Sequence, residues 1–130
     1  MNVAGYISWG ANGEFISTFT TNGTVAFSGD SKWYPMMTIE SFNGQRDNPN
    51  TAQGNFLQWF STNAFGSTNY ENAPVGAVSY VEEPGSPDST NDPFVYFGDW
   101  TAGKCFAICA WISSQRPAVF QAVGDPFVTR

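Results

Sequence analysis

Short apolar runs, separated by polar stretches rich in turn residues, dominate the pattern of this sequence. Runs of roughly four to eight apolar residues between turn signals are typical of buried strands. The chain has such runs at residues 3–9, 36–39 and 75–81, and it closes with a strand pair or one bent strand at 120–123 and 127–129. Because these runs are continuous rather than alternating, we expect strands that are covered on both faces, as in a parallel sheet.

A first helix is predicted over residues 52–65. Its apolar side chains recur at a helical spacing, so they fall on one face of the predicted helix. Asn50, with Gln53 three residues later, has the pattern of a capping pair, and Gly66 is the expected terminator. We therefore expect an amphipathic helix between the second and third strands.

A second helix is predicted over residues 100–114, with Asp99 as its N-cap. Lys104 is the only charged residue in this segment. A helix that is apolar on nearly every side is normally covered by other parts of the protein. Residues 17–31 are expected to form an irregular polar insertion, and the proline-rich loop 84–93 to lie at the surface without a regular element.

Strands that alternate with helices predict an α/β fold, a mostly parallel sheet with helices on its faces. The chain has 130 residues, which is the size of one domain, and it contains no repeat or linker that divides it. We therefore expect a single α/β domain spanning residues 1–130.

The charge of the chain argues against two classes of partner. Charged residues make up 12% of the sequence, and the net charge is −6. The five basic residues are scattered, whereas nucleic acids and anionic membranes are bound by clustered Lys and Arg. No apolar run approaches the roughly 20 residues that cross a bilayer. This acidic chain is therefore expected to bind neither nucleic acid nor membrane.

The N-terminal sequence lacks the basic segment of a signal peptide and enters strand-like sequence almost at once. The sequence therefore leaves two locations open, the cytoplasm or a secreted parent whose leader this chain lacks. The low charge and the many Asn, Ser, Thr and Gly residues also suit a secreted parent whose leader is not part of this chain.

Three predicted strands end in polar residues. The pairs are Ser8-Trp9, Glu40-Ser41 and Glu82-Glu83. In an open parallel sheet the ligand site lies beyond the carboxyl ends of the strands. We therefore predict a ligand site for a small molecule or a protein at Trp9, Glu40, Ser41, Glu82 and Glu83.

Carboxylates that meet at such an edge can act in more than one way. They can form an acid and base pair, because neighbouring like charges separate their pKa values. They can also bind a calcium or magnesium ion, with Glu82, Asp88 and Asp92 as candidate ligands. The alternative without function is that they are solvated or bonded to helix amides.

Nucleophilic catalysis has little support in this sequence. The chain contains no histidine, so neither Ser41 nor a cysteine can pair with an imidazole base. Cys105 and Cys109 are four residues apart in the predicted second helix, where a disulfide between them would distort the backbone. We expect two free, buried thiols and no catalytic residue among them.

The segments APVGAVSYVEEP, FGDWTAGKCFAICAW and FQAVGDPFV, in this order, resemble the C-terminal part of gingipain-like peptidases of the caspase-type fold. Upstream, VAGYISWGANG and MMTIESFNGQ resemble the two strands that carry the catalytic His and Cys of that family. The matching positions, 9–12 and 40–42, hold neither residue. The resemblance thus implies a caspase-like half-domain without its catalytic dyad, a pseudoenzyme.

Three functions remain open at this point. The first is a non-catalytic binding or interaction module on this degenerate scaffold, with no cofactor. The second is a small hydrolase or lyase that uses Glu40 with Glu82 or Glu83. The third is an extracellular all-β ligand binder with exposed aromatic side chains. The half-domain would leave the strand 3–9 with an unpaired edge, and the apolar second helix lacks cover, so we also expect a homo-oligomer.

Overall fold

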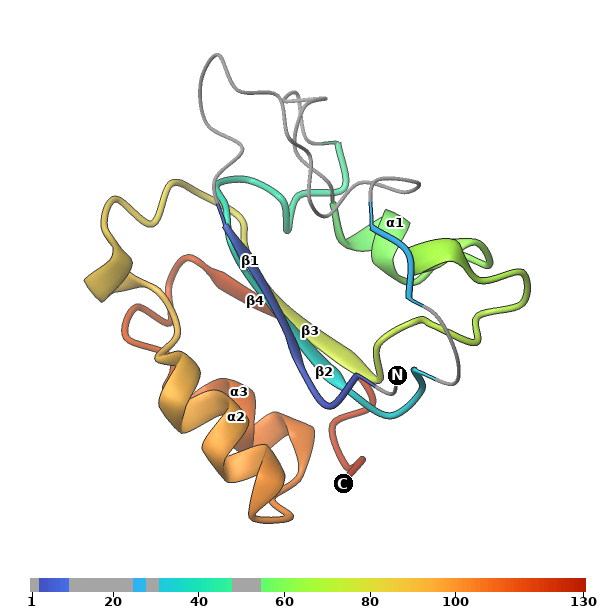
Figure 1. The fold of residues 1–130 in the computed structure, drawn as a ribbon. Coiled ribbons are helices and arrows are strands. Elements are labelled where there is room, and N and C mark those ends of the chain that lie inside the picture. The colour runs from blue at the N-terminus through green and yellow to red at the C-terminus, as the bar shows by residue number, and fades with distance from the viewer. Residues whose placement is uncertain (1–2, 10–24, 28–30, 48–54) are drawn as a thin grey trace.

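The computed structural model describes residues 3–9, 25–27, 31–47 and 55–130. Its centre is one four-stranded sheet (Figure 1), formed by β1 (Tyr6–Trp9), β2 (Pro35–Ile39), β3 (Gly76–Tyr80) and β4 (Phe120–Gly124). The strands are ordered β1-β2-β3-β4. The first three are parallel, and β4 runs antiparallel to β3. This confirms an α/β fold with a mostly parallel sheet, and the helical content excludes an all-β fold.

Helices cover both faces of the sheet. On one side lie α2 (Pro93–Thr101) and α3 (Phe106–Ser113), and on the other lies α1 (Phe56–Trp59), as Figure 1 shows. The described residues also contain two short 3-10 helices, η1 (Ala64–Gly66) and η2 (Pro87–Ser89). No helix in the described part of the chain is long and apolar enough to cross a membrane.

Alternate side chains of the same strands build two separate cores. Met37 and Val78 pack toward the helices α2 and α3, with Tyr96, Trp100, Phe106, Cys109 and Ala110. Their neighbours Met36 and Ala77 pack toward α1, with Tyr34, Trp59, Ala64 and Phe65. Because both faces are buried, the strands read as continuous apolar runs, and this is why the sequence predicted them.

Asn91 fixes the helical pair to the sheet. It is 1% exposed and precedes α2. Its side-chain oxygen accepts from the Tyr80 hydroxyl at 3.1 Å, and its amide nitrogen donates to the Ala110 carbonyl at 2.9 Å. Burial raises the pKa of Tyr80 to about 12, so its hydroxyl stays a donor at neutral pH. One side chain thus connects β3 to α3.

The single helix expected over 100–114 is wrong, because the segment forms the end of α2 and all of α3. Gly103 has a φ of 83°, which ends α2 in the left-handed conformation that glycine adopts easily. The cap is Asp92 rather than Asp99, since the Asp92 side chain accepts from the Phe94 and Val95 amides. As a result α2 begins inside the loop that was expected to extend to residue 93.

The helix expected over 52–65 is also much shorter within the described residues. The helix α1 begins after Asn55, whose side chain and that of Gln58 form a reciprocal capping box. The proposed capping pair Asn50 and Gln53 lies outside the described residues. The backbone of Asn55 is extended, and its side chain accepts a hydrogen bond from the Leu57 amide. Asn55 therefore acts as the N-cap, and the helix begins at the next residue.

Two further expectations concern residues 127–129 and the insertion 17–31. Residues 127–129 form no strand; instead the Val128 carbonyl accepts from the Phe106 amide at 2.9 Å and meets the start of α3. Most of the insertion 17–31 lies outside the described residues. Its described residue Phe27 stacks on Phe65 with ring centroids 5.0 Å apart, so it belongs to the core on the α1 side.

We predict that Gly76→Ala destabilises the fold and that Gly98→Ala does not. A Cβ at Gly76 would lie 2.5 Å from a ring carbon of Phe106, whereas a Cβ at Gly98 meets nothing within 4 Å. Overpacking at Gly76 should lower the free energy of unfolding by about 1 to 3 kcal/mol. The helical substitution at Gly98 should raise it by up to about 1 kcal/mol. Urea unfolding of both variants measures these changes, and equal stability of the two would contradict the packing described above.

Candidate ligand-binding site

The parallel strands bring three polar strand ends to one edge of the sheet. Tyr6 to Trp9 pair in register with Met36 to Ile39, so β1 and β2 end together. The third strand runs in the same direction beside β2. Glu40 and Ser41 follow β2, and Glu82 and Glu83 follow shortly after β3. We call this edge, with Ser8, Glu40, Ser41 and Glu83, the carboxyl rim.

Glu40 is the interior carboxylate of the carboxyl rim. It is 2% exposed, and the hydroxyl of Ser8 donates to its Oε1 at 3.3 Å. Tyr6 lies near enough to sense this charge. Burial, and to a smaller degree the negative charge of Glu40, raise the pKa of Tyr6, while the Ser8 hydroxyl opposes the shift. Glu40 therefore contributes a fixed acceptor and a local negative potential behind the rim.

Ser41 and Glu83 join the ends of two strands. The Ser41 hydroxyl donates to Oε2 of Glu83, although the residues are 42 positions apart in the chain. The other oxygen, Oε1, accepts from the Gly85 amide at 3.2 Å. Ser41 is 3% exposed, whereas Glu83 is an exposed residue. The carboxylate of Glu83 is thus held in place by two donors while it still faces solvent.

The remaining predicted site residues do not join this group. Glu82 is exposed. Trp9 is the last residue of β1, and its side chain lies outside the described part of the structure. Asp92 caps α2, and it lines a separate cavity of about 370 Å³ together with Asp88. Among the described residues no three His, Cys, Asp or Glu side chains are arranged to hold a metal ion. Glu82, Asp88 and Asp92 therefore do not form a ligand set here.

The loop after β2 is anchored by Asn43, which the sequence analysis did not identify. Its amide nitrogen donates to Thr38 Oγ1 at 2.6 Å, and its Oδ1 accepts from the Tyr80 amide at 3.1 Å. Its backbone carbonyl accepts from the Phe56 amide at 3.1 Å. The available signal was the Asn43-Gly44 dipeptide directly after a strand, which marks a turn that returns to the sheet.

Polar side chains on the α1 side cross the whole sheet in one row: Ser8, Thr38, Ser79 and Gln121. Within this row, Ser79 Oγ and Gln121 Oε1 have no hydrogen-bond partner. The row is closed over by Gly44, because a Cβ there would lie 2.8 Å from Gln121 Oε1 and 3.0 Å from Ser79 Oγ. It therefore forms a floor beneath the loop and leaves no space for a ligand.

Both cysteines are free, and they lie on the α2 and α3 side of the sheet. Cys105 is the N-cap residue of α3, not an interior helical residue as expected, and Cys109 lies within the helix. Burial raises the pKa of the Cys109 thiol to about 11. A thiol with this pKa is not a nucleophile at neutral pH. The chain also lacks histidine, so a cysteine and imidazole dyad cannot form.

Comparison with known proteins finds no matching family model. It likewise finds no matching curated protein and no matching solved structure. The likeness to gingipain-like peptidases therefore remains a prediction from the motifs of the sequence. What the carboxyl rim does must be inferred from its own geometry.

Proposed function

We propose that this chain is a non-catalytic binding module whose ligand site is the carboxyl rim. The observation that carries the proposal is the Ser41 to Glu83 hydrogen bond, which holds an exposed carboxylate at the ends of two parallel strands. The resemblance to a caspase-type scaffold without its catalytic pair agrees with a binding role.

The ligand that suits the carboxyl rim is one that donates hydrogen bonds and carries positive charge. Ser8, Ser41 and Gly85 already supply donors to the two carboxylates, so what remains toward solvent is acceptor capacity on Glu83. Guanidinium groups present paired N–H donors that match a carboxylate. The net charge of −6 also attracts a cation over a distance. We therefore propose a guanidinium or ammonium group as the recognised part of the ligand.

Holding Glu83 in place distinguishes it from Glu82. A carboxylate that is already ordered loses less conformational entropy when a ligand binds. Ser41 and Gly85 order Glu83, whereas Glu82 makes no described contact with the carboxyl rim. These two neighbouring acids have the same charge and similar exposure. Glu82 is therefore a matched control for the contribution of Glu83.

We predict that Glu83→Gln weakens the binding of agmatine, a small guanidinium probe, and that Glu82→Gln leaves it nearly unchanged. Loss of one exposed charged contact should reduce the affinity roughly five-fold, about 1 kcal/mol. Titration followed by amide chemical shifts in NMR spectra measures the affinity and locates the site. Shifts should appear in residues 40–45 and 81–85. Equal weakening by both substitutions would show attraction to net charge alone and would contradict the proposed site.

A calcium or magnesium ion is the alternative ligand for Glu83. The same titration with each chloride salt tests it. Thermal stabilisation by an ion that Glu83→Gln abolishes would replace the organic cation by a metal in the proposal.

A hydrolase or lyase is the second candidate, because the Ser41 hydroxyl and two carboxylates meet at one edge. Its acid and base pair would be Glu40 with Glu83, since Glu82 lies apart. Catalysis is the less favoured function because Glu40 is almost fully covered and the chain offers no imidazole to activate Ser41. Hydrolysis of 4-nitrophenyl acetate that disappears in Ser41→Ala would favour the enzyme over the binding module.

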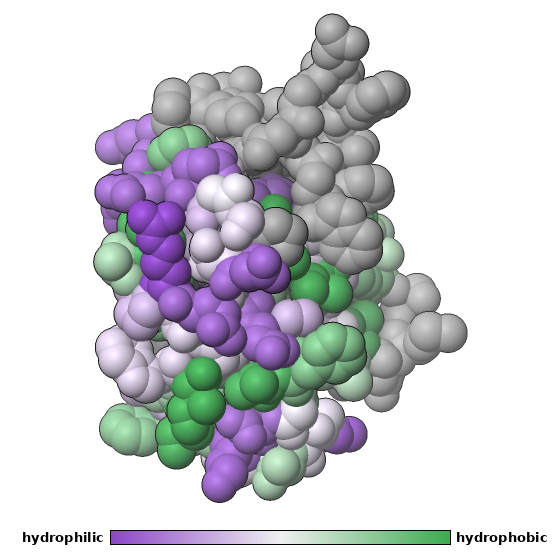
Figure 2. All heavy atoms as spheres, turned by 90° about the vertical axis from the view of Figure 1, so that its left-hand side faces the viewer, coloured by the Kyte–Doolittle hydropathy of each residue, from purple (hydrophilic) through white to green (hydrophobic). Residues whose placement is uncertain are grey.

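We also propose that the chain forms a homodimer through the outer face of α3. Ile108, Trp111 and Ile112 follow one another at helical spacing and are 41%, 64% and 59% exposed. Figure 2 shows hydrophobic residues gathered low on this side of the molecule, over α2 and α3. Phe106, the first residue of the same helix, is instead buried in the core. Contiguous apolar surface of this kind is typical of an interface.

We predict that the chain runs in solution with twice its mass of 14.2 kDa and that Trp111→Ser shifts it toward a monomer. Removing the largest exposed side chain of the interface lowers the affinity of the two copies. Light scattering on a sizing column measures the mass. The control is Leu57→Ser, which removes an exposed apolar side chain on the opposite side of the sheet. A mass near 14.2 kDa at every loading would exclude the dimer.

A further inference from the structure

The sheet ends at β4, and the outer edge of this strand pairs with no described residue. The strand order is β1-β2-β3-β4, so β4 is bonded to β3 alone. Its sequence, Phe-Gln-Ala-Val-Gly, contains no charged residue and no proline. Charges and prolines are what usually protect an edge strand from pairing with another chain. This edge, which we call the β4 edge, therefore has the chemistry of a pairing site.

Backbone hydrogen bonds show how the residues of β3 are oriented. The Tyr80 amide donates to Asn43 Oδ1, which belongs to the loop after β2. The next residue, Val81, donates instead to the Val119 carbonyl at 2.9 Å, just before β4. Because successive residues of a strand direct their backbone groups to opposite sides, Ser79 directs its N–H and C=O toward β4.

The register then gives the orientation of β4. Ser79 lies opposite Gln121, so these two residues exchange backbone hydrogen bonds. The flanking residues, Phe120 and Ala122, direct their N–H and C=O groups away from β3, to the β4 edge. A row of alternating donors and acceptors fits an extended strand, which completes the sheet by adding to it.

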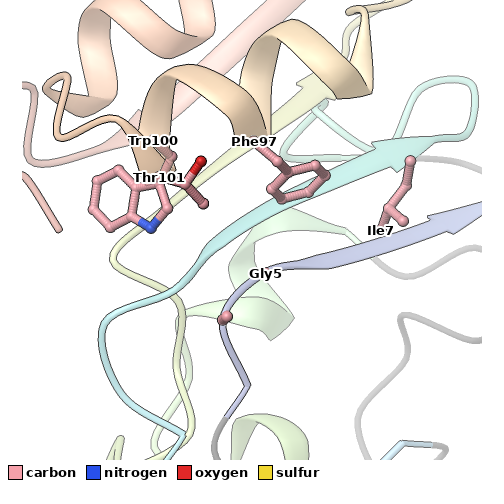
Figure 3. Close-up of a pocket in the computed structure, with 6 residues that line it drawn as sticks. Gly5, Ile7, Phe97, Trp100 and Thr101 are labelled. Atoms are coloured by element: carbon pink, nitrogen blue, oxygen red, sulfur yellow. The ribbon is translucent and has the colours of Figure 1, made fainter.

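The two edges of the sheet are covered differently on the side of α2 and α3. At the β1 edge, Phe97 of α2 extends over the strand that carries Gly5 and Ile7 (Figure 3), and a Cβ at Gly5 would lie 2.8 Å from its ring. At the β4 edge, α3 leaves an open hollow of about 300 Å³, and Phe120 and Ala122 are among its walls. The β4 edge therefore lacks the cover that α2 gives to β1.

We propose that two copies of this chain pair through their β4 strands, antiparallel, with Ala122 of one copy opposite Ala122 of the other. Ala122 is the central residue of β4, so a two-fold axis at this position pairs all five residues of each strand. Phe120 of each copy then lies opposite Gly124 of the other, which has no side chain to obstruct the ring. This inference rests on the proposed homodimer and adds the β4 edge to its interface.

The β4 edge and the exposed face of α3 form one surface. The Trp111 ring lies against Phe120 with ring centroids 6.1 Å apart, and Trp111 is 64% exposed. Neither α3 nor β4 contains a charged residue, whereas the chain has a net charge of −6. Two copies with the same net charge repel each other least through such an uncharged surface, which favours a second copy as the occupant.

The charges that flank β4 favour an antiparallel pair of identical strands. Arg116 precedes the strand in a turn, where its carbonyl accepts from the Val119 amide at 3.2 Å, and Asp125 directly follows the strand. Both residues are exposed. An antiparallel pair brings Arg116 of each copy toward Asp125 of the other. Because an exposed ion pair adds little affinity, these charges select the orientation rather than the strength of the pair.

The variants Ala122→Lys and Ala122→Glu test the pairing and its register. Each places two like charges directly opposite one another, so each should raise the dissociation constant of the dimer at least about five-fold. An equal mixture of the two variants places opposite charges at this position and should recover an affinity near that of the unmodified chain. The control is Thr101→Lys, at an exposed position beside Gly5, which alters the net charge equally and should have no effect. Analytical ultracentrifugation measures the dissociation constants.

Amide hydrogen exchange in the unmodified chain gives a second measurement that needs no substitution. Exchange of the Ala122 amide should slow as the protein concentration rises, whereas the Gln121 amide, bonded to β3, should exchange slowly throughout. A mass near 14.2 kDa at every concentration would exclude the homodimer itself. A doubled mass with Ala122 exchange that does not depend on concentration, or a variant mixture that stays as weak as its components, would overturn the β4 pairing alone.

Discussion

The carboxyl edge of this sheet depends on the side chain of Asn43. Its side-chain amide nitrogen donates to the Thr38 hydroxyl on β2, and its side-chain oxygen accepts from the Tyr80 backbone N–H on β3. Asn43 is fully buried, so each of these groups would lack a partner without it. A buried group left without a hydrogen bond costs about 1 to 3 kcal/mol. Two backbone bonds, Gly44 to Tyr80 and Phe56 to Asn43, add to this anchor.

The anchor decides where the candidate ligand site can form. Glu40 and Ser41 lie between the end of β2 and Asn43, so their backbone is held at both ends. In this placement the Ser41 hydroxyl donates to Glu83, and Glu40 lies beside Ser8. Aromatic and aliphatic side chains fill most of the other face of the sheet, where the buried side chain of Asn91 joins Tyr80 to α3. Among the described residues on this face, the indole N–H of Trp100 has no hydrogen-bond partner.

The sequence predicted the strands well for a physical reason. Burial on both faces makes each strand a continuous apolar run, and such runs are visible without any knowledge of their partners. The helices were predicted less well because single turn and capping residues override apolar periodicity. Gly103 divides one apolar segment into two helices, and the capping box at Asn55 delays the start of α1.

Only part of the candidate site could be predicted from the sequence. Acids at strand ends are visible in the sequence, and parallel pairing brings Glu40 and Glu83 to one edge. Which of two adjacent exposed acids is held by neighbouring donors depends on the groups that the fold brings to it, here the Ser41 hydroxyl and the Gly85 amide. For this reason Glu83 could not be separated from Glu82, and the polar row beneath Gly44 depends on a register between strands far apart in sequence.

The role of Asn43 is tested most directly by the hydrogen-exchange rate of the Tyr80 amide, measured in the unmodified chain and in Asn43→Ala. The Tyr80 amide donates to Asn43 Oδ1, whereas Ala77 in the same strand lies three residues from this contact. The account predicts slow exchange at both positions in the unmodified chain. In Asn43→Ala, exchange should accelerate at Tyr80 and stay slow at Ala77. Unchanged exchange at Tyr80 would contradict the role assigned to Asn43 and, with it, the geometry of the carboxyl rim.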